Sequence, residues 1–276
     1  MFAAVSALAW GAGDFSGGLA SKRASALSVM PISTSVGLLV LAVVATARRA
    51  PMVTSHDALF AFLAGVFGAV GTLGLYQALA NGKMGIAAPL TAAIANAIAL
   101  LYGALTEGLP RPLQGVGFLL AILAVWCITR ARQDTSQTSR EHRGWLLPVA
   151  LSGIGFGLFF SFNAQFTASD ISWAVVEVRL VTLCLIVAMA LVSHPSFGRA
   201  GKTWPLVLLA GTTSALGDLS YALATRLGRL DVGAVLSSLY PLVTVGLAMV
   251  ILRERLTREQ WAGVALAVGS VVLIVL

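Results

Sequence analysis

Residues Tyr221 to Leu276 read YALATRLGRLDVGAVLSSLYPLVTVGLAMVILRERLTREQWAGVALAVGSVVLIVL. This stretch contains the end of an apolar helix, a basic turn, a second apolar helix, a charged hinge at 253–257 and a third apolar helix. The same order occurs earlier, from Tyr76 to Cys127, as YQALANGKMGIAAPLTAAIANAIALLYGALTEGLPRPLQGVGFLLAILAVWC. The chain therefore contains this arrangement twice.

The two copies align over their whole length. An Ala-Leu-Ala stretch recurs after 144 residues, Gly82 corresponds to Gly228 at an offset of 146, and Glu107 corresponds to Glu254 at an offset of 147. We interpret the two glutamates, which lie at helix ends beside loops, as structural hinges. A repeat of this length predicts two structural halves, which in a membrane protein is the usual plan of a transporter.

The composition predicts a multi-span integral membrane protein. Of the 276 residues, 58% are hydrophobic and 11% are charged, and the mean hydropathy is +0.90. An ordinary soluble domain does not have such a surface. The net charge of +7 comes from Lys and Arg in short loops, as the inner-leaflet bias of membrane proteins explains. No basic face carries interleaved aromatic residues, so nucleic acid is not an expected partner.

The fold class predicted is an all-α integral membrane protein with ten transmembrane helices arranged as two inverted five-helix repeats. A membrane span needs about 20 mostly apolar residues. The first repeat, 1–129, and the second, 144–276, are joined by a polar linker at 130–143. Because each half has an odd number of spans, the second must enter the membrane from the opposite side. The expected spans are 2–20, 26–47, 58–80, 86–106, 113–129, 145–168, 173–192, 204–225, 232–252 and 261–275.

Glycines predict close contacts between helices. They recur in the third span, as at Gly71, and in the sixth, as at Gly155. Small residues let helix backbones approach where lipid-solvated helices have no apolar driving force to associate.

The doubled block resembles the EamA-like part of the drug/metabolite transporter superfamily. The resemblance covers nearly the whole chain and implies a ten-helix transporter, but it does not define a substrate. The first copy departs from the pattern with Pro89 and Asn96, where the second copy has Leu236 and Val243. The matching features are Trp10-Gly11, Ala222-Leu223, Gly228, Ser237 to Pro241, Leu252 to Leu256, and Gly263.

Four ionisable residues fall inside predicted spans, where a charge costs a few kcal/mol, so each is a functional candidate. Asp14 either binds a cationic group or a coupling proton, or is a structural partner of Arg179. Glu177 and Arg179 are two residues apart and cannot neutralise each other along one helix face. Asp218 and Tyr221 share a face and either line a cavity or serve helix packing.

Uncharged residues complete the predicted substrate-binding set: Trp10, Tyr76, Asn96, Asn163 and Tyr240. The aromatic residues are also explained by packing, whereas an amide in mid-span needs a partner. Pro89 and Pro241 are predicted hinges, because proline frees a backbone carbonyl.

An enzyme reading rests on Gly11-Ala12-Gly13-Asp14, which resembles the Gly-x-Gly-Asp of intramembrane aspartyl proteases, with Asp218 as the second carboxylate. The Tyr-Asp motif of those enzymes is missing, and neither a Walker sequence nor a metal-binding motif occurs. We therefore expect no catalytic residues, no metal and no cofactor.

The expected function is secondary transport of small organic metabolites, amino acids or drugs by alternating access, with export implied by the family resemblance. A carrier of lipid-linked sugars or nucleotide sugars is the alternative. A proton is the favoured coupling ion, with Asp14, Glu177 or Asp218 as the titrating group. The partners are a small-molecule substrate and the lipid bilayer, and the location expected is the inner (plasma) membrane of a prokaryote.

Overall fold

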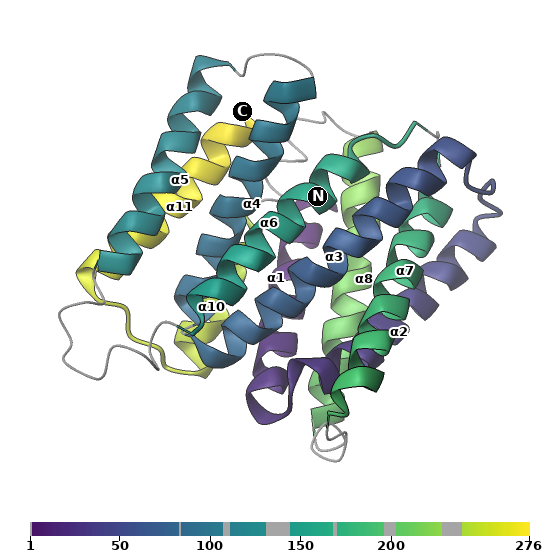
Figure 1. Cartoon of the computed structure of the whole chain (residues 1–276), viewed down its shortest axis with the longest axis horizontal. Coiled ribbons are helices and arrows are strands. Elements are labelled where there is room, and N and C mark those ends of the chain that lie inside the picture. The colour runs from purple at the N-terminus through teal and green to yellow at the C-terminus, as the bar shows by residue number, and fades with distance from the viewer. Residues whose placement is uncertain are drawn as a thin grey trace.

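A computed structural model of the chain describes residues 2–82, 84–106, 111–130, 144–167, 170–195, 203–227 and 239–276. Within these residues the chain forms ten α-helices and no β-strand (Figure 1). The first half contains α1 (Phe2–Arg23), α2 (Ala26–Ala47), α3 (Ser55–Asn81), α4 (Met84–Thr106) and α5 (Pro112–Arg130). The second half contains α6 (Leu146–Asn163), α7 (Ser172–Ser193), α8 (Trp204–Leu227), α10 (Tyr240–Ile251) and α11 (Arg258–Val275).

Helices α2, α3, α4, α6 and α7 are each long and apolar enough to cross a membrane. Two shorter apolar helical stretches lie in α5 and α10. The expected spans at 2–20 and 204–225 are also helical but are less apolar, because they contain glycine, serine and a charged residue. The expected span at 261–275 is helical within α11. Of the expected span at 232–252, residues 232–238 lie outside the described residues, as do 131–143 of the expected linker.

The sixth helix ends earlier than predicted, at Asn163 rather than at 168. Beyond the end of the helix, Thr167 bonds to α3. Both the backbone amide and the hydroxyl of Thr167 donate to Oδ1 of Asp57, each at 3.0 Å. Asp57 is fully buried in the first turn of α3, where its own amide is capped by the hydroxyl of Thr54. This contact ties the α6–α7 connection to the start of α3.

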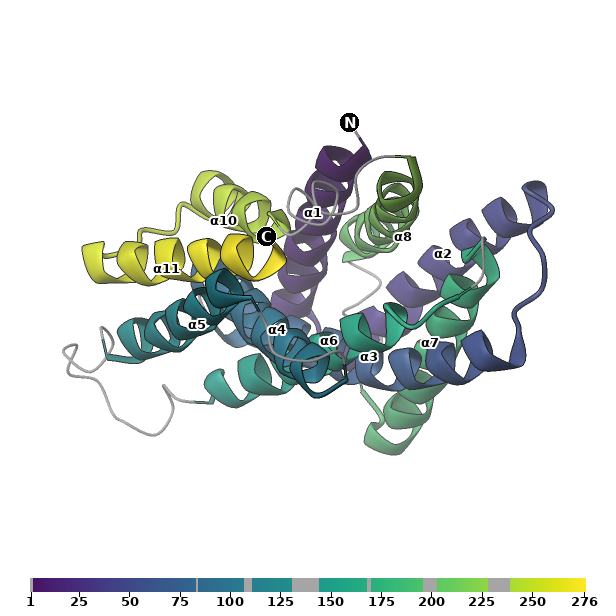
Figure 2. The same cartoon turned by 90° about the horizontal axis from the view of Figure 1, so that it is seen from above.

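The helices pack in pairs drawn from both halves. Helix α5 packs against α11 at one edge of the molecule, and α2 packs against α7 at the opposite edge (Figures 1 and 2). Between these edges α3 packs along α6, and α1 packs along α8. The predicted role of glycine is confirmed at the first of these contacts, since a Cβ atom on Gly155 would lie 2.5 Å from the backbone nitrogen of Gly71.

One end of the molecule is tightly packed. There α1 and α3 end, α4 and α6 begin, and Leu79 and Met84 are fully buried in the largest apolar cluster. The carboxylate of Glu254, in the hinge after α10, accepts hydrogen bonds from the amides of Met84 and Gly85 at 3.1 and 3.0 Å. Lys22 of α1 lies 3.7 Å from the same carboxylate. The structural interpretation of Glu254 fits this geometry, and Glu107 lies outside the described residues.

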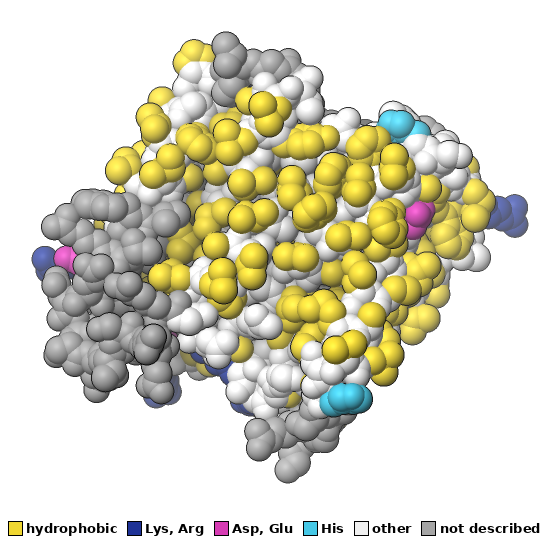
Figure 3. Space-filling model, in the orientation of Figure 1, with side chains coloured by type: hydrophobic (Ala, Val, Ile, Leu, Met, Phe, Trp, Pro, Cys, Tyr) yellow, Lys and Arg dark blue, Asp and Glu magenta, His cyan; other side chains and the backbone are white. Residues whose placement is uncertain are grey.

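The outer surface is apolar. Hydrophobic side chains cover the middle of the face seen in Figure 3, and the Lys and Arg side chains visible there lie at its margins. Leu105, Val192 and Val250 are each more than three-quarters exposed. A surface of this kind is suited to lipid rather than to water.

Candidate functional site

A cavity lies between the helices, lined by residues of α1, α2, α3, α6, α7, α8 and α10. The space that the centre of a water molecule can reach measures about 110 Å³. Seven of the ten predicted substrate-binding residues line this cavity: Trp10, Asp14, Tyr76, Asn163, Arg179, Asp218 and Tyr240.

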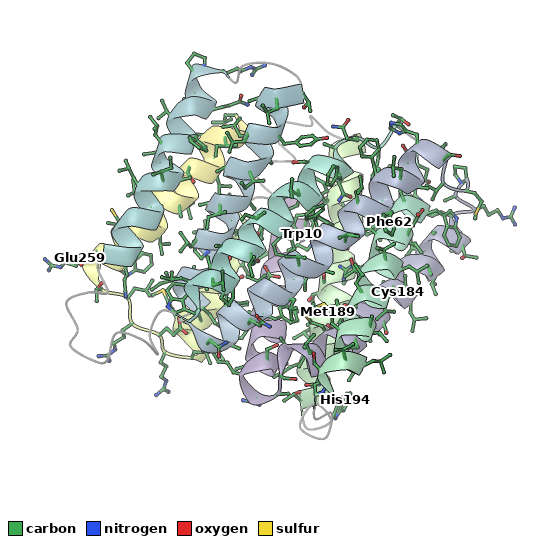
Figure 4. All side chains as sticks on the ribbon, in the orientation of Figure 1. Trp10, Phe62, Cys184, Met189, His194 and Glu259 are labelled. Atoms are coloured by element: carbon green, nitrogen blue, oxygen red, sulfur yellow. The ribbon has the colours of Figure 1, made fainter. Side chains whose placement is uncertain are left out.

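A hydrogen-bonded network joins three helices on one wall of the cavity. Asp218 of α8 accepts a hydrogen bond from the indole Nε1 of Trp10 at 2.8 Å. Its other oxygen accepts from Nε and Nη2 of Arg179 on α7, at 3.2 and 2.7 Å. The same Nη2 donates to the hydroxyl of Ser214 at 2.5 Å. Figure 4 places Trp10 near the centre of the molecule. The carboxylate of Asp218 is therefore paired with a cation and also accepts a neutral donor.

Asp14 differs from Asp218, although both line the same cavity. Within the described part of the chain, no hydrogen bond or ion pair joins Asp14 to another side chain. The sequence analysis offered pairing with Arg179 as the structural alternative for Asp14. In the structure Arg179 pairs with Asp218 instead. A carboxylate that lies in an apolar helix bundle and has no basic side chain as a partner can accept a proton or bind a positively charged group.

Glycines of α1 bring aromatic residues close to Asp14. One turn before it, a Cβ atom on Gly11 would lie 2.6 Å from the backbone oxygen of Tyr240. One turn after it, a Cβ atom on Gly17 would overlap the ring of Tyr76. Both tyrosines line the cavity. The glycine-rich sequence of α1 thus places two tyrosines along the helix on either side of the carboxylate.

A second wall of the cavity is apolar and comes mainly from α6. Phe156, Phe159 and Phe160 line it, and their rings contact one another at centroid distances of 5.3 to 6.4 Å. Phe156 and Phe159 rest against α3 at Gly71 and Gly68. Sequence reasoning missed these phenylalanines, because in an apolar helix a phenylalanine that lines a cavity is indistinguishable from one that faces lipid.

Hydroxyl groups around the cavity were also missed by the sequence analysis. Ser33, Thr34, Thr72, Thr182 and Ser214 line it. Serine and threonine occur throughout membrane helices, where they hydrogen-bond to their own backbone, so the residue type alone gives no signal. One available signal was position: Ser214 lies one turn before Asp218, on the same helix face.

Three of the predicted substrate-binding residues do not line the cavity: Asn96, Glu177 and Tyr221. The amide of Asn96 donates to the carbonyl oxygen of Ala92 at 2.8 Å, within its own helix. Glu177 lies on α7 two residues before Arg179 and points elsewhere, as the helical geometry requires. The ring of Tyr221 packs on Trp10, with the ring centroids 5.3 Å apart.

The predicted hinge prolines occupy different positions. Pro89 lies inside α4 and is buried, so the carbonyl of Gly85 lacks the amide donor that a continuous helix supplies. Pro241 lies in the first turn of α10, where a missing amide costs nothing. Asn163 is the last residue of α6 rather than a mid-span residue, and its amide donates to the carbonyl of Phe159 at 2.7 Å.

A bundle of apolar helices around a polar cavity defines a membrane protein that can hold a small solute within the bilayer. Among the described residues, no group of three or more His, Cys, Asp or Glu side chains is arranged to hold a metal ion.

The chain belongs to the EamA-like transporter family, whose sequence model matches residues 1–130 and again 136–276. A crystal structure of a protein with 16% sequence identity has the same fold, with a TM-score of 0.68 over 99% of this chain and 98% of that one. No curated protein is significantly similar in sequence. The protein is thus a multi-pass membrane protein with a transporter fold.

Proposed function

We propose that the protein is a secondary transporter that exports small organic metabolites, amino acids or drugs by alternating access. The observation that carries this proposal is the polar cavity, which residues from both halves of the chain line and which contains the carboxylate of Asp14, paired with no side chain in the described part of the chain. A site between two halves changes its accessibility when the halves move relative to each other. Export, rather than uptake, follows from the family resemblance.

Two matching contacts support inverted repeats. The hydroxyl of Ser6 on α1 donates to the carbonyl of Gly217 on α8 at 3.0 Å. The hydroxyl of Ser152 on α6 donates to the carbonyl of Gly71 on α3 at 2.7 Å. Positions 6 and 152 differ by 146, and so do positions 71 and 217. The contact of the first helix of one half with the third helix of the other is thus made twice, as a two-fold relation between the halves requires.

The packed end of the molecule supports alternating access. There the Glu254 carboxylate of the second half caps α4 of the first, and Lys22 of α1 lies beside it. These contacts and the apolar cluster beneath them join the two halves on one side of the cavity. In the proposed cycle they separate when the cavity opens toward that side.

Asp14 is the carboxylate that we propose for proton coupling. Asp218 is held by Arg179 and Trp10, and a proton on it would break that network. Glu177 does not line the cavity. Asp14 faces the cavity without a cation partner among the described residues, so its protonation changes the charge of the solute site directly.

Neither alternative function gains support from the site. An aspartyl protease needs two carboxylates that share a proton. The oxygens of Asp218 instead accept from Trp10 and Arg179, and no hydrogen bond joins it to Asp14 among the described residues. A nucleotide sugar would bring phosphates to a cavity whose charged lining residues, Asp14, Asp218 and Arg179, sum to −1 when all are ionised.

Reconstituted transport tests the proposal. Purified protein in proteoliposomes should exchange labelled solutes from a panel of amino acids, amines and sugars faster than protein-free liposomes do. An imposed pH gradient should accelerate this flux in the wild type and leave it unchanged in Asp14→Asn. If no solute is exchanged above the protein-free rate, secondary transport is refuted. If the wild-type flux does not change with the pH gradient, only the proposal of proton coupling fails.

A further inference from the structure

We propose that the cavity binds a small amphipathic organic cation that carries no carboxylate, with its ammonium group at Asp14 and its apolar part against the phenylalanines of α6. This inference rests on the proposed transport function and narrows its substrate. It follows from three features of the cavity: its charge balance, the aromatic residues around Asp14, and the difference between its two walls.

The charge balance favours a cation over an anion or a zwitterion. Arg179 is the one basic residue among the described residues that line the cavity. Its Nε and Nη2 atoms already donate to Asp218 and Ser214. Binding a solute carboxylate there would place it beside Asp218, and two adjacent carboxylates repel. Among the described lining residues, Asp14 is the charged group without an oppositely charged partner, and it attracts a positive group.

The surroundings of Asp14 favour an organic ammonium group over a metal ion. Tyr76 and Tyr240 lie one turn on either side of it, and Trp10 contacts the Tyr240 ring edge to face at a centroid distance of 6.0 Å. Aromatic faces attract ammonium groups through their quadrupole, most strongly where water is excluded. A sodium or calcium ion instead needs a shell of several oxygen ligands.

The repeat relates the phenylalanines of α6 to the polar residues of α1. With the offset of 146 that relates the paired serines of α1 and α6, Trp10 corresponds to Phe156, and Asp14 corresponds to Phe160. All four residues line the cavity. Where the first half carries a carboxylate and an indole, the second half carries two phenyl rings.

The other charged residues have uncharged counterparts in the same way. With the offset of the paired glycines of α3 and α8, Asp218 corresponds to Thr72. Arg179 corresponds to Thr34 because the two occupy the same place in a repeated contact. Each directly follows a residue whose carbonyl oxygen lies against a glycine of the neighbouring helix. Both threonines line the cavity. The charged groups of the cavity therefore come from α1, α7 and α8, and their counterparts on α2, α3 and α6 are phenyl and hydroxyl groups. A solute that matches both walls has one charged end and one apolar end.

The size of the cavity limits the apolar part to about one ring. The space of about 110 Å³ is of the same order as an apolar cavity of about 150 Å³ that holds benzene. Phenethylammonium, which has one ring and one ammonium group, is therefore a suitable probe. Its neutral, anionic and zwitterionic analogues are 2-phenylethanol, 3-phenylpropanoate and phenylalanine.

Binding to the full-length protein in detergent, measured by isothermal titration calorimetry, tests the inference. Phenethylammonium should bind, and its three analogues should bind at least about ten-fold more weakly, because each lacks the charge-assisted contact to Asp14 or adds a carboxylate that is repelled. Sodium should also bind at least about ten-fold more weakly, because it needs a shell of several oxygen ligands. Asp14→Asn should weaken the binding of phenethylammonium by about ten-fold or more. Glu177→Gln is the matched control: it removes one carboxylate from a membrane helix outside the cavity and should leave binding unchanged.

A second variant tests the apolar wall. Phe160→Leu should weaken the binding of phenethylammonium more than the binding of ethylammonium, which has no ring. No binding of phenethylammonium at millimolar concentration, equal binding of phenylalanine, or an unaltered affinity in Asp14→Asn would each overturn the inference. If proteoliposomes exchange labelled phenylalanine or 2-phenylethanol but not the cation, the substrate inference fails while the transport function stands.

Discussion

Replacing Asp218 by asparagine should strongly destabilise the protein, because one carboxylate serves two donors that reach it from different helices. Its two oxygens accept three hydrogen bonds, one from Trp10 and two from Arg179. An asparagine keeps one acceptor oxygen and turns the other into an amino group, which must then face either the indole N–H or the guanidinium. The substitution also leaves the charge of Arg179 without its partner.

The magnitude follows from the burial of the pair. The side chains of Arg179 and Asp218 are 17% and 16% exposed, and the closest N···O distance is 2.7 Å. Two unit charges about 4 Å apart interact by about 4 kcal/mol at an effective dielectric constant of about 20. Removing one partner of a buried pair costs about 3–5 kcal/mol. Because this pair borders a cavity, we expect the lower end of that range, about 3 kcal/mol.

A double-mutant cycle measures the coupling. Asp218→Asn, Arg179→Gln and the double variant are unfolded reversibly in mixed micelles, and their free energies of unfolding are compared with that of the wild type. The double variant should lose less stability than the sum of the single variants, with a coupling free energy of about 2 kcal/mol, because neither charge is then left alone.

The exposed pair between Arg48 and Asp170 provides the control. Its N···O distance is 3.5 Å, with side chains 48% and 24% exposed. Asp170→Asn should therefore cost less than about 1 kcal/mol. Additive effects of the Asp218 and Arg179 substitutions would refute the argument that these two residues neutralise each other.

Three further predictions use the same unfolding assay. Glu254→Gln should lower the free energy of unfolding by about 1–2 kcal/mol, because the carboxylate that caps the first amides of α4 loses its charge; an unchanged stability would contradict the capping role. Gly155→Val should prevent recovery of monodisperse protein, since its Cβ atom would lie 2.5 Å from a backbone atom of α3, whereas Gly246→Val, whose Cβ atom would meet nothing within 4 Å, should be tolerated. Hydrogen bonds from Ser172 and the nearby guanidinium of Arg48 hold the pKa of Asp170 below its ordinary value. The stability that this carboxylate contributes is present above about pH 4 and is lost as the pH falls through its lowered pKa, an acid-dependent loss that Asp170→Asn should abolish.

The sequence by itself determined the class, the helical segments and the doubled plan of the protein. Apolar runs of about 20 residues are unambiguous because crossing the bilayer demands them. The same physics made Asp14, Arg179 and Asp218 visible, since an ionisable residue in such a run is costly and rarely retained without a role. All three of these residues line one cavity.

Only the tertiary structure decided which of these residues interact. The sequence analysis named Asp14 as the structural partner of Arg179, whereas the partner in the structure is Asp218, because this depends on how α1, α7 and α8 are placed around one another. Asn96 and Glu177 lie in equally apolar helices but face away from the cavity, because the direction of a side chain depends on which neighbours its helix packs against. The sequence analysis missed the phenylalanines of α6 for the opposite reason. A phenylalanine side chain has no energetic cost in lipid, so only the structure shows that these residues border the cavity.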